Sequence, residues 1–364
     1  MTKRDYSLLG LDGERAIETG LATAEWYHSD ISRKEMKALM KREDGPATRD
    51  TIIWIGAMVV LAGIGIALWP SWWSAPFWIA YGVLYGSASD SRWHECGHGT
   101  AFKTRWMNDV VYQIACFMIV RNPHTWRWSH ARHHTDTYIV GRDPEIAIMR
   151  PPDLARVILN LIGLLGPIMG WKQMLFNATG QLSTEEKSYI PETEQSKVIR
   201  VARIWTAIYA AVIVLALAMG SILPLMVIGL PSIYGAWHYV LVGLLQHGAL
   251  ADNVIDHRLN TRTVYINPIS RFIYWNMSFH IEHHMFPMVP YHRLPELHAR
   301  IKDDLPEPTP SILAGYREMV PVLLRQLKNE EVYLRRTLPG TARPYREDLH
   351  EAALGGAPLA QPAE

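Results

Sequence analysis

Histidine is concentrated in three short segments of the chain. Eight of the 16 histidines fall in them. The segments are His94-Glu-Cys-Gly-His98, His130-Ala-Arg-His133-His134 and His280-Ile-Glu-His283-His284. Residues three and four apart share one face of a helix, so each segment directs two or three imidazoles at the same point. Imidazole is a good ligand for iron, zinc, copper and nickel, and the pattern therefore predicts a metal centre.

The number of histidines favours two iron ions over one zinc ion. A zinc site is complete with four ligands, or with three ligands and a water. Eight imidazoles exceed that number, whereas two six-coordinate irons accept them and keep open positions for O₂. A membrane zinc hydrolase is the alternative from another enzyme class. A metal transporter would hold its ligands near the bilayer midplane, which does not fit the placement of these segments beyond the apolar stretches.

Other histidines are judged singly. His247 follows the last apolar stretch at the depth of the three segments, so we expect it to be a ninth ligand. His238, with Trp237 beside it, lies deeper and either lines a substrate cavity or packs between helices. Metal-bound histidine usually donates its second N–H to a neighbouring acceptor. The acidic residues expected to accept it are Asp143, Glu145 and Glu282. The histidines expected at the surface or behind the ligands are His124, His257, His292 and His298.

The elements that must hold these ligands are apolar. Residues 51–89 and 204–245 contain no Asp, Glu, Lys or Arg. A membrane-crossing helix needs about 20 apolar residues, so each block is long enough for two crossings. Turn residues lie near the middle of each block. We therefore expect an all-α integral-membrane protein in which a cytoplasmic helical cap carries the metal site. Its four spans, in two hairpins, are expected at about 51–69, 72–89, 204–220 and 224–245.

Charge sets the expected orientation. Basic residues precede the first span and follow the second and fourth, whereas the hairpin turns carry no charge. The positive-inside rule then places both termini and the histidine segments in the cytoplasm. A net charge of +1 gives no reason to expect nucleic acid as a partner. The two cysteines, Cys96 and Cys116, suit a reducing compartment.

The regions outside the spans divide into smaller parts. Ser32 and Glu35 form a capping box that opens a helix in the cytoplasmic N-terminal segment, residues 1–50. The apolar stretches 110–120 and 157–171 are too short or too interrupted to cross a membrane, so we expect them at the interface. The catalytic domain is expected at 51–305, a cytoplasmic helix at 306–338, and a disordered tail rich in Pro, Gly and Ala at 339–364.

Around its histidine segments the chain resembles the membrane fatty-acid desaturase superfamily. The resemblance is carried by Trp93–Asn108, Arg127–Thr135 and Phe279–His292, and it covers about 51–305 with the same two hairpins. Within that superfamily the segments are most similar to the MocD-like branch of bacterial rhizopine-catabolism oxygenases. The resemblance implies a multi-pass protein of the bacterial inner membrane.

The resemblance also implies a set of ligands and an electron donor. The expected ligands of the two irons are His94, His98, His130, His133, His134, His280, His283 and His284. His247 matches an extra ligand of many members, and Asn276 matches a residue that holds an iron-bound water. The chain has no His-Pro-Gly-Gly haem segment and no cysteine–histidine pairs of a Rieske cluster. Electrons are therefore expected from a separate Rieske-type [2Fe–2S] ferredoxin with its reductase.

The expected reaction is the O₂-dependent oxidation of a C–H bond. Hydroxylation, desaturation and demethylation can share one metal centre, because the substrate decides which product forms. The MocD-like segments favour hydroxylation that leads to oxidative demethylation of a small N- or O-methylated polar compound. A fatty acyl lipid desaturase or hydroxylase is the alternative within the class. The aromatic residues that could cage a methylammonium by cation–π attraction, or simply pack helices, are Trp93, Trp126, Trp128, Trp237, Tyr239 and Trp275.

Overall fold

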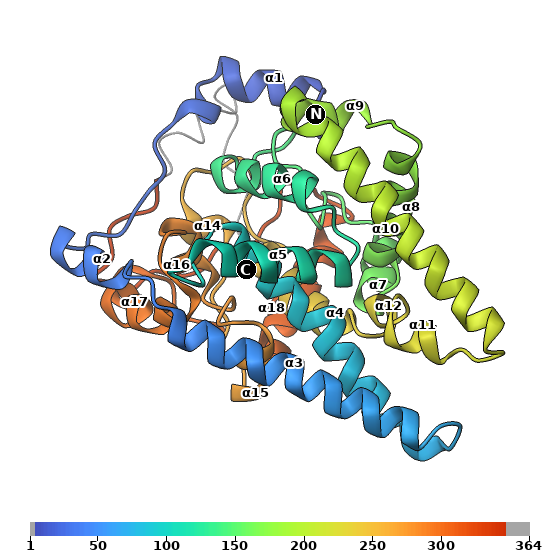
Figure 1. The fold of residues 1–364 in the computed structure, drawn as a ribbon. Helices are drawn as coiled ribbons and strands as arrows, with labels where there is room; N and C mark the ends of the chain where they lie inside the picture. Colours follow the sequence, from blue (N-terminus) through green and yellow to red (C-terminus); the bar gives the residue numbers. More distant parts are fainter. Residues whose placement is uncertain (1–3, 347–364) are drawn as a thin grey trace.

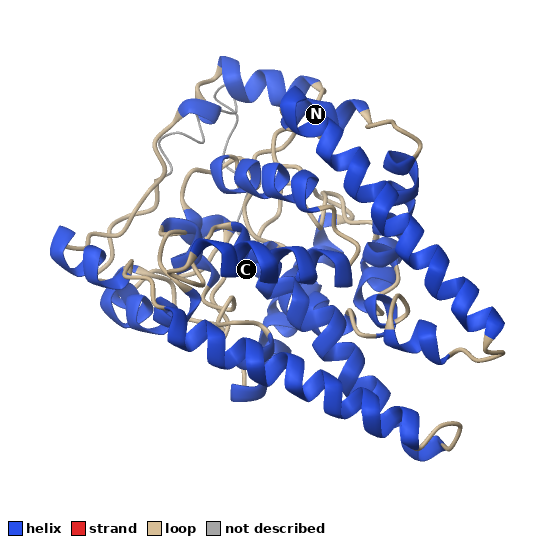
Figure 2. Ribbon diagram, in the orientation of Figure 1, coloured by secondary structure: helices blue, strands red, loops and turns tan. Residues whose placement is uncertain are grey.

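A computed structural model describes residues 4–346 of the chain. Helices joined by loops make up these residues and no strand is drawn among them, as Figure 2 shows, so the expected all-α class is confirmed. Extended segments meet within them at two isolated bridges, Thr263 with Phe279 and Val264 with Thr309. The long helices run together toward one end of the molecule, and shorter helices form a cap at the other end (Figure 1).

The helices follow one another closely along the chain. The α-helices are α1 (Leu11–Glu18), α2 (Arg33–Leu39), α3 (Asp44–Ala67), α4 (Ala75–Gly97), α5 (Arg105–Met118), α6 (Pro123–Thr135), α7 (Leu154–Leu161), α8 (Leu165–Ala178), α9 (Thr184–Tyr189), α10 (Glu192–Ala218), α11 (Leu223–Val227), α12 (Pro231–Tyr234), α13 (Trp237–His247), α14 (His257–Asn260), α15 (Pro268–Ile273), α16 (His280–Met285), α17 (Leu294–Ile301) and α18 (Ile312–Gln326). The 3₁₀ turns are η1 (Leu21–Thr23), η2 (Trp72–Ser74), η3 (Tyr291–Arg293) and η4 (Lys302–Asp304).

The first predicted hairpin is present as α3 and α4. The two helices pack against each other, and the Trp54 indole N–H donates to the Leu84 carbonyl over 2.7 Å. Gly65 allows the Trp78 ring to lie against α3, because a Cβ on Gly65 would lie 2.8 Å from that ring. The helical stretch that ends with α3 is long and apolar enough to cross a membrane. The last turns of α4 are polar and buried, since they enter the cap.

The second apolar block differs from the prediction. α10 is long and apolar enough to cross a membrane, but the expected fourth span, residues 224–245, is divided among α11, α12 and α13. Gly229 has a φ of 103°, which a right-handed helix does not allow. Pro231 lacks an N–H, so it begins α12 and cannot extend α11. The described residues therefore contain two helices that could cross a membrane, or three if the bent α7–α8 pair counts as one, in place of the four expected spans.

The two shorter apolar stretches form helices as well. Residues 110–120 lie mostly in α5, and residues 157–171 are divided between α7 and α8. These two helices meet at an angle of 90°. Gly163 sits in the bend with a φ of 76°, and a Cβ there would lie 2.9 Å from the Ile233 carbonyl oxygen. The expected interfacial position of these helices stays a prediction.

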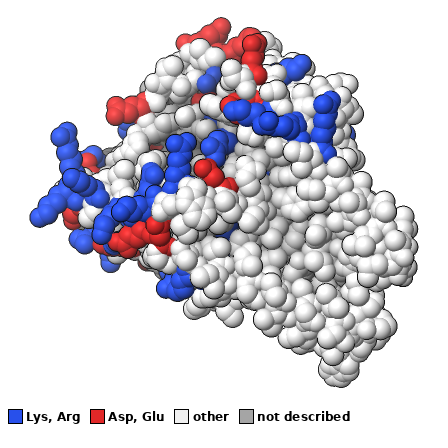
Figure 3. All heavy atoms as spheres, viewed as in Figure 1, with Lys and Arg blue, Asp and Glu red and all other residues white. Residues whose placement is uncertain are grey.

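Charged side chains are unevenly distributed over the face seen in Figure 3. They gather over the cap, whereas the end formed by the tips of α3 and α10 is uncharged. At that end Trp72 and Trp73 are 92% and 78% exposed. A large uncharged surface of this kind suits a lipid environment, and indole rings favour the membrane–water interface.

The N- and C-terminal segments both pack on the cap. The predicted capping box is present at the start of α2, where the Ser32 hydroxyl accepts from the Glu35 N–H over 3.2 Å. Residues 339–346 lie against Arg258, whose guanidinium donates to the Arg343 carbonyl over 2.9 Å. The remainder of the expected disordered tail, residues 347–364, lies outside the described residues.

Gly235→Ala is expected to destabilise the fold. A Cβ on Gly235 would lie 1.7 Å from the Gly82 carbonyl oxygen of α4, and a backbone atom cannot turn away. Displacing α12 from α4 is expected to lower the free energy of unfolding by about 1–3 kcal/mol. Thermal unfolding of the detergent-solubilised protein measures this loss. Gly56→Ala is the control, because no atom lies within 4 Å of a Cβ there and alanine favours the helix. Equal losses in the two variants would contradict this account of the packing.

Candidate metal centre

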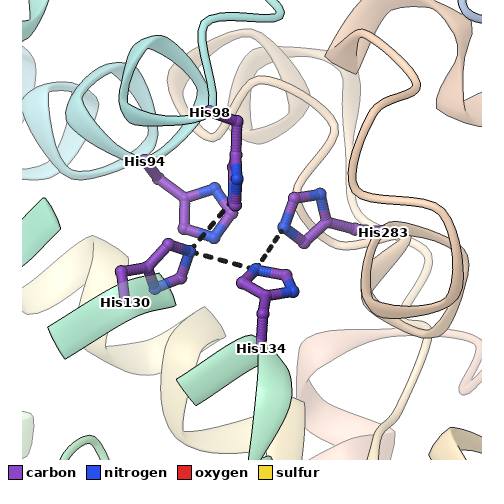
Figure 4. Close-up of side chains that lie close together, drawn as sticks. All are labelled: His94, His98, His130, His134 and His283. Atoms are coloured by element: carbon purple, nitrogen blue, oxygen red, sulfur yellow. Dashed lines mark hydrogen bonds between the residues drawn. The ribbon is translucent and has the colours of Figure 1, made fainter. Parts of the chain in front are cut away.

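The structure brings all nine expected ligand histidines together in two clusters. The first cluster consists of His94, His98, His130, His134 and His283, and the second of His133, His247, His280 and His284. Within each cluster, one ring nitrogen of every histidine lies within 4.8 Å of those of the others. Figure 4 shows the first cluster, in which the side chains come from the end of α4, from α6 and from α16. Their role as ligands stays a prediction.

Neither cluster is built from one segment. α6 contributes His130 and His134, which lie one turn apart, to the first cluster and His133 to the second. α16 contributes His283 to the first cluster and its two remaining histidines to the second. The clusters adjoin, because the rings of His134 and His284 stack with their centroids 4.5 Å apart.

Burial keeps most of these imidazoles neutral. It lowers the pKa of His98 to about 4 and the pKa of His247 to about 3. Burial also lowers the pKa well below its ordinary value at His94, His130, His134, His280, His283 and His284. At His133 burial also opposes the charge, but the nearby carboxylates of Asp143 and Glu145 together outweigh it and raise the pKa. A neutral imidazole keeps a lone pair on one nitrogen, which is the form that binds a metal.

Two of the expected carboxylates contact ligand imidazoles. Asp143 Oδ2 lies 2.8 Å from His133 Nδ1, and Glu145 Oε2 lies 3.0 Å from His130 Nδ1. Each carboxylate accepts the Nδ1–H and so leaves the lone pair on Nε2, which points into the cluster. Glu282 behaves differently from the expectation. It bonds His298 and the Thr263 hydroxyl, neither of which belongs to a cluster.

Glu95 is an additional carboxylate of the first cluster. Its Oε1 lies 3.4 Å from His94 Nδ1 and 3.6 Å from His283 Nδ1, while Oε2 accepts from the Tyr291 N–H over 3.1 Å. The side chain is fully buried, and this burial raises its pKa to about 8. Sequence reasoning missed Glu95, although its position beside His94 on one helix is a usable signal.

The second cluster is held mainly by neutral groups. His247 Nδ1 donates to the Asn260 carbonyl over 2.8 Å, which leaves the lone pair on Nε2, and that buried nitrogen has no hydrogen-bond partner in the described structure. His280 Nδ1 lies 3.1 Å from the Gln246 amide, and His284 Nδ1 lies 3.2 Å from the Thr137 hydroxyl. The sequence offered no signal for Gln246, Thr137 or Asn260, because their positions depend on the fold.

The ring nitrogens fit a set of metal ligands. In the first cluster Nε2 of His130 lies 3.2 Å from that of His98 and 3.1 Å from that of His134, and Nε2 of His134 lies 3.1 Å from that of His283. His130 already donates its one proton toward Glu145, so its Nε2 presents a lone pair to two other nitrogens. Lone pairs that converge in a buried site repel one another, and a cation bound between them removes this repulsion. Imidazole-rich sites of this kind suit first-row transition metals.

Other residues singled out from the sequence do not belong to the two clusters. Asn276 accepts from the Arg271 guanidinium and donates to the Tyr291 carbonyl, each over 3.0 Å. His238 bonds the Ser270 hydroxyl over 3.0 Å, and Trp237 is 37% exposed. His257 and His298 are buried behind the clusters and not at the surface. His124 is partly exposed and bonds Glu194 over 3.2 Å, and His292 is only partly buried.

A cavity of about 670 Å³ touches both clusters. It extends from the histidines between α4, α6, α7, α8 and α13 toward the N-terminal segment. His238 and Trp237 are not among the described residues that line it, so the structure does not support their expected place in a substrate cavity. Its walls carry charged and polar groups beside apolar ones, including Asp90, Arg121, Glu145 and Gln246.

The aromatic cage expected for a methylammonium already holds a cation. The Arg121 guanidinium lies 4.3 Å from the Trp126 ring centroid and 5.1 Å from that of Trp93, and Tyr239 is 5.6 Å away. Arg121 also donates to Asp90 over 2.7 Å. This ion pair lines the cavity, so a substrate meets a charged pair in place of an empty cage.

The family model of fatty acid desaturases matches residues 67–315 of the chain. This range contains all nine histidines of the two clusters. The chain belongs to the fatty acid desaturase family. Members of this family are di-iron oxidoreductases, which agrees with the expected enzyme class and with the two histidine clusters. The finer resemblance to the MocD-like branch stays a prediction.

Several plant desaturases are similar to this desaturase-family chain. It is 25% identical over 260 residues to the chloroplastic sn-2 acyl-lipid omega-3 desaturase (ferredoxin) of Arabidopsis thaliana, covering 66% of this chain and 58% of the relative. It is 26% identical over 282 residues to the acyl-lipid (9+3)-(E)-desaturase of Dimorphotheca sinuata, covering 68% of this chain and 74% of the relative. The endoplasmic-reticulum acyl-lipid omega-3 desaturase (cytochrome b5) of Arabidopsis thaliana is 24% identical over 259 residues, covering 65% of each chain. The chain spans about six-tenths of the length of the chloroplastic relatives.

Proposed function

We propose that this chain is a membrane-bound, O₂-dependent di-iron oxygenase that hydroxylates a C–H bond of a compact polar substrate. The observation that carries the proposal is the cavity that touches both histidine clusters and is lined by the Asp90–Arg121 ion pair. Where the hydroxylated carbon is a methyl on nitrogen or oxygen, the product loses formaldehyde. The overall reaction is then an oxidative demethylation.

The ion pair argues for a polar substrate. The side chains of Arg121 and Asp90 are 20% and 13% exposed, and both line the cavity wall. An acyl chain packed against them would remove the remaining water and offer no hydrogen bond in return, which is costly for charged groups. A substrate with hydroxyl, amine or carboxylate groups replaces that water.

The histidines and their neighbours have defined tasks in this proposal. The nine imidazoles would hold two iron ions, which would supply the O₂-dependent oxidising power when bound. Asp143 and Glu145 fix the Nδ1 protons of His133 and His130, so that the opposite nitrogens stay directed into the clusters. Each hydroxylation consumes one O₂, two electrons and two protons, and one oxygen atom leaves as water.

The partners and the location follow from the same proposal. The chain would receive electrons from a separate protein, for which a Rieske-type [2Fe–2S] ferredoxin with its reductase is our candidate. The names of two relatives specify ferredoxin and cytochrome b5. The long apolar helices would lie in a bacterial inner membrane, with both termini and the histidine clusters on the cytoplasmic side.

Acyl-lipid desaturation is the second candidate, and the relatives favour it. All three relatives described above are acyl-lipid desaturases by name. A zinc hydrolase is a weaker alternative, because the nine histidines of the two clusters together exceed what one zinc ion binds.

Formaldehyde is the expected product that separates the two candidates. Purified enzyme is supplied with ¹⁸O₂, a ferredoxin system and a panel of methylated amines, methyl ethers and acyl lipids. A methylated polar substrate is expected to yield formaldehyde that carries ¹⁸O before exchange with water, reduced at once to methanol so that the oxygen is retained, and measured by mass spectrometry. His283→Ala enzyme is the control for chemistry that does not need the first cluster. New double bonds in acyl lipids, without formaldehyde from any methylated compound, would replace the proposed function by the second candidate.

A further inference from the structure

Three buried polar atoms lie close together at the first cluster without forming hydrogen bonds. They are Glu95 Oε1, His94 Nδ1 and His283 Nδ1, and none of them has a hydrogen-bond partner among the described residues. The carboxylate oxygen lies 3.4 Å from the first nitrogen and 3.6 Å from the second. A buried polar group without a partner costs free energy, so three at one point indicate a role beyond packing.

The proton positions that metal binding demands would complete these contacts. In a neutral imidazole one nitrogen carries the proton and the other carries the lone pair. To bind a metal through Nε2, His94 and His283 must each hold their proton on Nδ1. Both Nδ1–H groups then need an acceptor. Glu95 Oε1 can accept from both after a small movement of the rings, because N–H···O hydrogen bonds span about 2.7–3.2 Å.

The second oxygen of this carboxylate is held from the opposite side. Glu95 Oε2 accepts from the Tyr291 N–H over 3.1 Å and lies 3.4 Å from the Thr100 hydroxyl. Tyr291 stacks on Trp275 with ring centroids 4.2 Å apart, and its hydroxyl donates to Asp50 over 2.8 Å. Since these contacts fix Tyr291, they also fix the carboxylate with Oε1 toward the two histidines.

We propose that Glu95 is a shared positioning residue of the first metal site, where one of its oxygens accepts the Nδ1–H groups of both His94 and His283. These two histidines lie on α4 and α16, so the carboxylate joins ligands from different parts of the chain (Figure 4). The proposal rests on the proposed function in one respect, namely that the clusters bind metal. It does not depend on the substrate.

A carboxylate suits this position and an amide does not. Both oxygens of Glu95 would accept hydrogen bonds, one from the Tyr291 N–H and the other from the two imidazoles. Glutamine has an acceptor at one end of its amide and an NH₂ donor at the other. Whichever way the amide is turned, the NH₂ group meets an N–H group. Glu95→Gln therefore keeps the size of the side chain but cannot make both contacts.

Glu95→Gln is expected to weaken one of the two metal-binding steps and to leave the other unchanged. Loss of a residue that orients a metal ligand typically costs about 10–100-fold in affinity, and we expect a loss of this size at the first cluster. Metal-free full-length protein in nanodiscs is titrated with Co²⁺ in competition with a chelator, and the visible absorption of the bound ion is recorded. His98→Ala removes an expected ligand of the first cluster and so identifies its binding step.

Glu282→Gln is the matched control. Glu282 is also fully buried and also precedes or follows ligand histidines in the sequence, but its carboxylate contacts Thr263 and His298. It is expected to leave both Co²⁺-binding steps as in the wild type. Equal losses at both steps in Glu95→Gln would overturn the proposal, and so would the same loss in Glu282→Gln.

A second variant reaches the carboxylate through its support. Tyr291→Phe keeps the ring and the backbone N–H but loses the hydrogen bond to Asp50. We expect a smaller loss at the same Co²⁺-binding step, and this variant serves if Glu95→Gln folds poorly. Thermal unfolding of the metal-free proteins verifies that each variant folds. A folded Tyr291→Phe protein with losses at the second cluster alone would contradict the proposal.

The titration separates failure of this proposal from failure of the proposed function. If the wild type binds two metal ions per chain and Glu95→Gln binds them equally well, the proposed centre stands and the shared role of Glu95 is refuted. If the wild type binds neither Co²⁺ nor iron, the proposed function itself is refuted.

Discussion

His133→Ala and His283→Ala are each expected to lose most of the bound iron and all O₂-dependent activity. His283 belongs to the first cluster and His133 to the second, so each substitution removes one expected ligand from one site. Loss of a residue that merely orients a metal ligand typically costs about 10–100-fold in metal affinity, and loss of the ligand itself should cost more. Iron is measured by elemental analysis of protein purified under matched conditions, and activity is measured as substrate-dependent O₂ consumption.

The control for this pair is His124→Ala. His124 is partly exposed, bonds Glu194 and lies outside both clusters, so its removal is expected to leave iron content and turnover close to those of the wild type. Circular dichroism and elution volume verify that all three variants fold. Full iron occupancy in both His133→Ala and His283→Ala would refute the assignment of the clusters.

His247→Ala is expected to impair iron binding and turnover severely, by at least tenfold, whereas His292→Ala should keep a substantial part of both. The Nδ1 proton of His247 goes to the Asn260 carbonyl, and its buried Nε2 faces the second cluster without a partner. His292 also has buried nitrogens without partners, but it lies outside both clusters. The comparison therefore tests position among the ligands and not burial alone.

The two variants also differ in the expected spectroscopic result. His247→Ala should change the environment of the iron that binds to the second cluster, seen in Mössbauer spectra of ⁵⁷Fe-loaded protein. His292→Ala should leave those spectra as in the wild type. Identical behaviour of the two variants in iron content, turnover and spectra would show that His247 is not a ninth ligand.

The histidines of the centre could be predicted from the sequence because their spacing is a local property. His130 and His134, for example, share a face of any helix that contains them. The division of nine histidines into groups of five and four could not be predicted, since it depends on how α4, α6, α13 and α16 meet. The contacts of Glu95 and Gln246 depend on the same packing.

The expected spans show where composition ceases to be informative. Residues 224–245 are apolar whether they form one helix or three, and hydropathy does not register the break at Gly229 and Pro231. The aromatic cage illustrates the same point for the site. Trp93 and Trp126 do come together in edge contact, but the guanidinium of Arg121, which is distant from Trp93 in sequence, lies over both rings.

The sharing of α6 between the clusters has a consequence for how such a centre can change over generations. A one-residue insertion within α6 would turn the following side chains by about 100° around the helix axis. It would withdraw His133 from one cluster and His134 from the other in a single event. A change in the register of this helix therefore removes ligands from both sites at once, whereas a substitution such as His133→Ala removes a ligand from one site only.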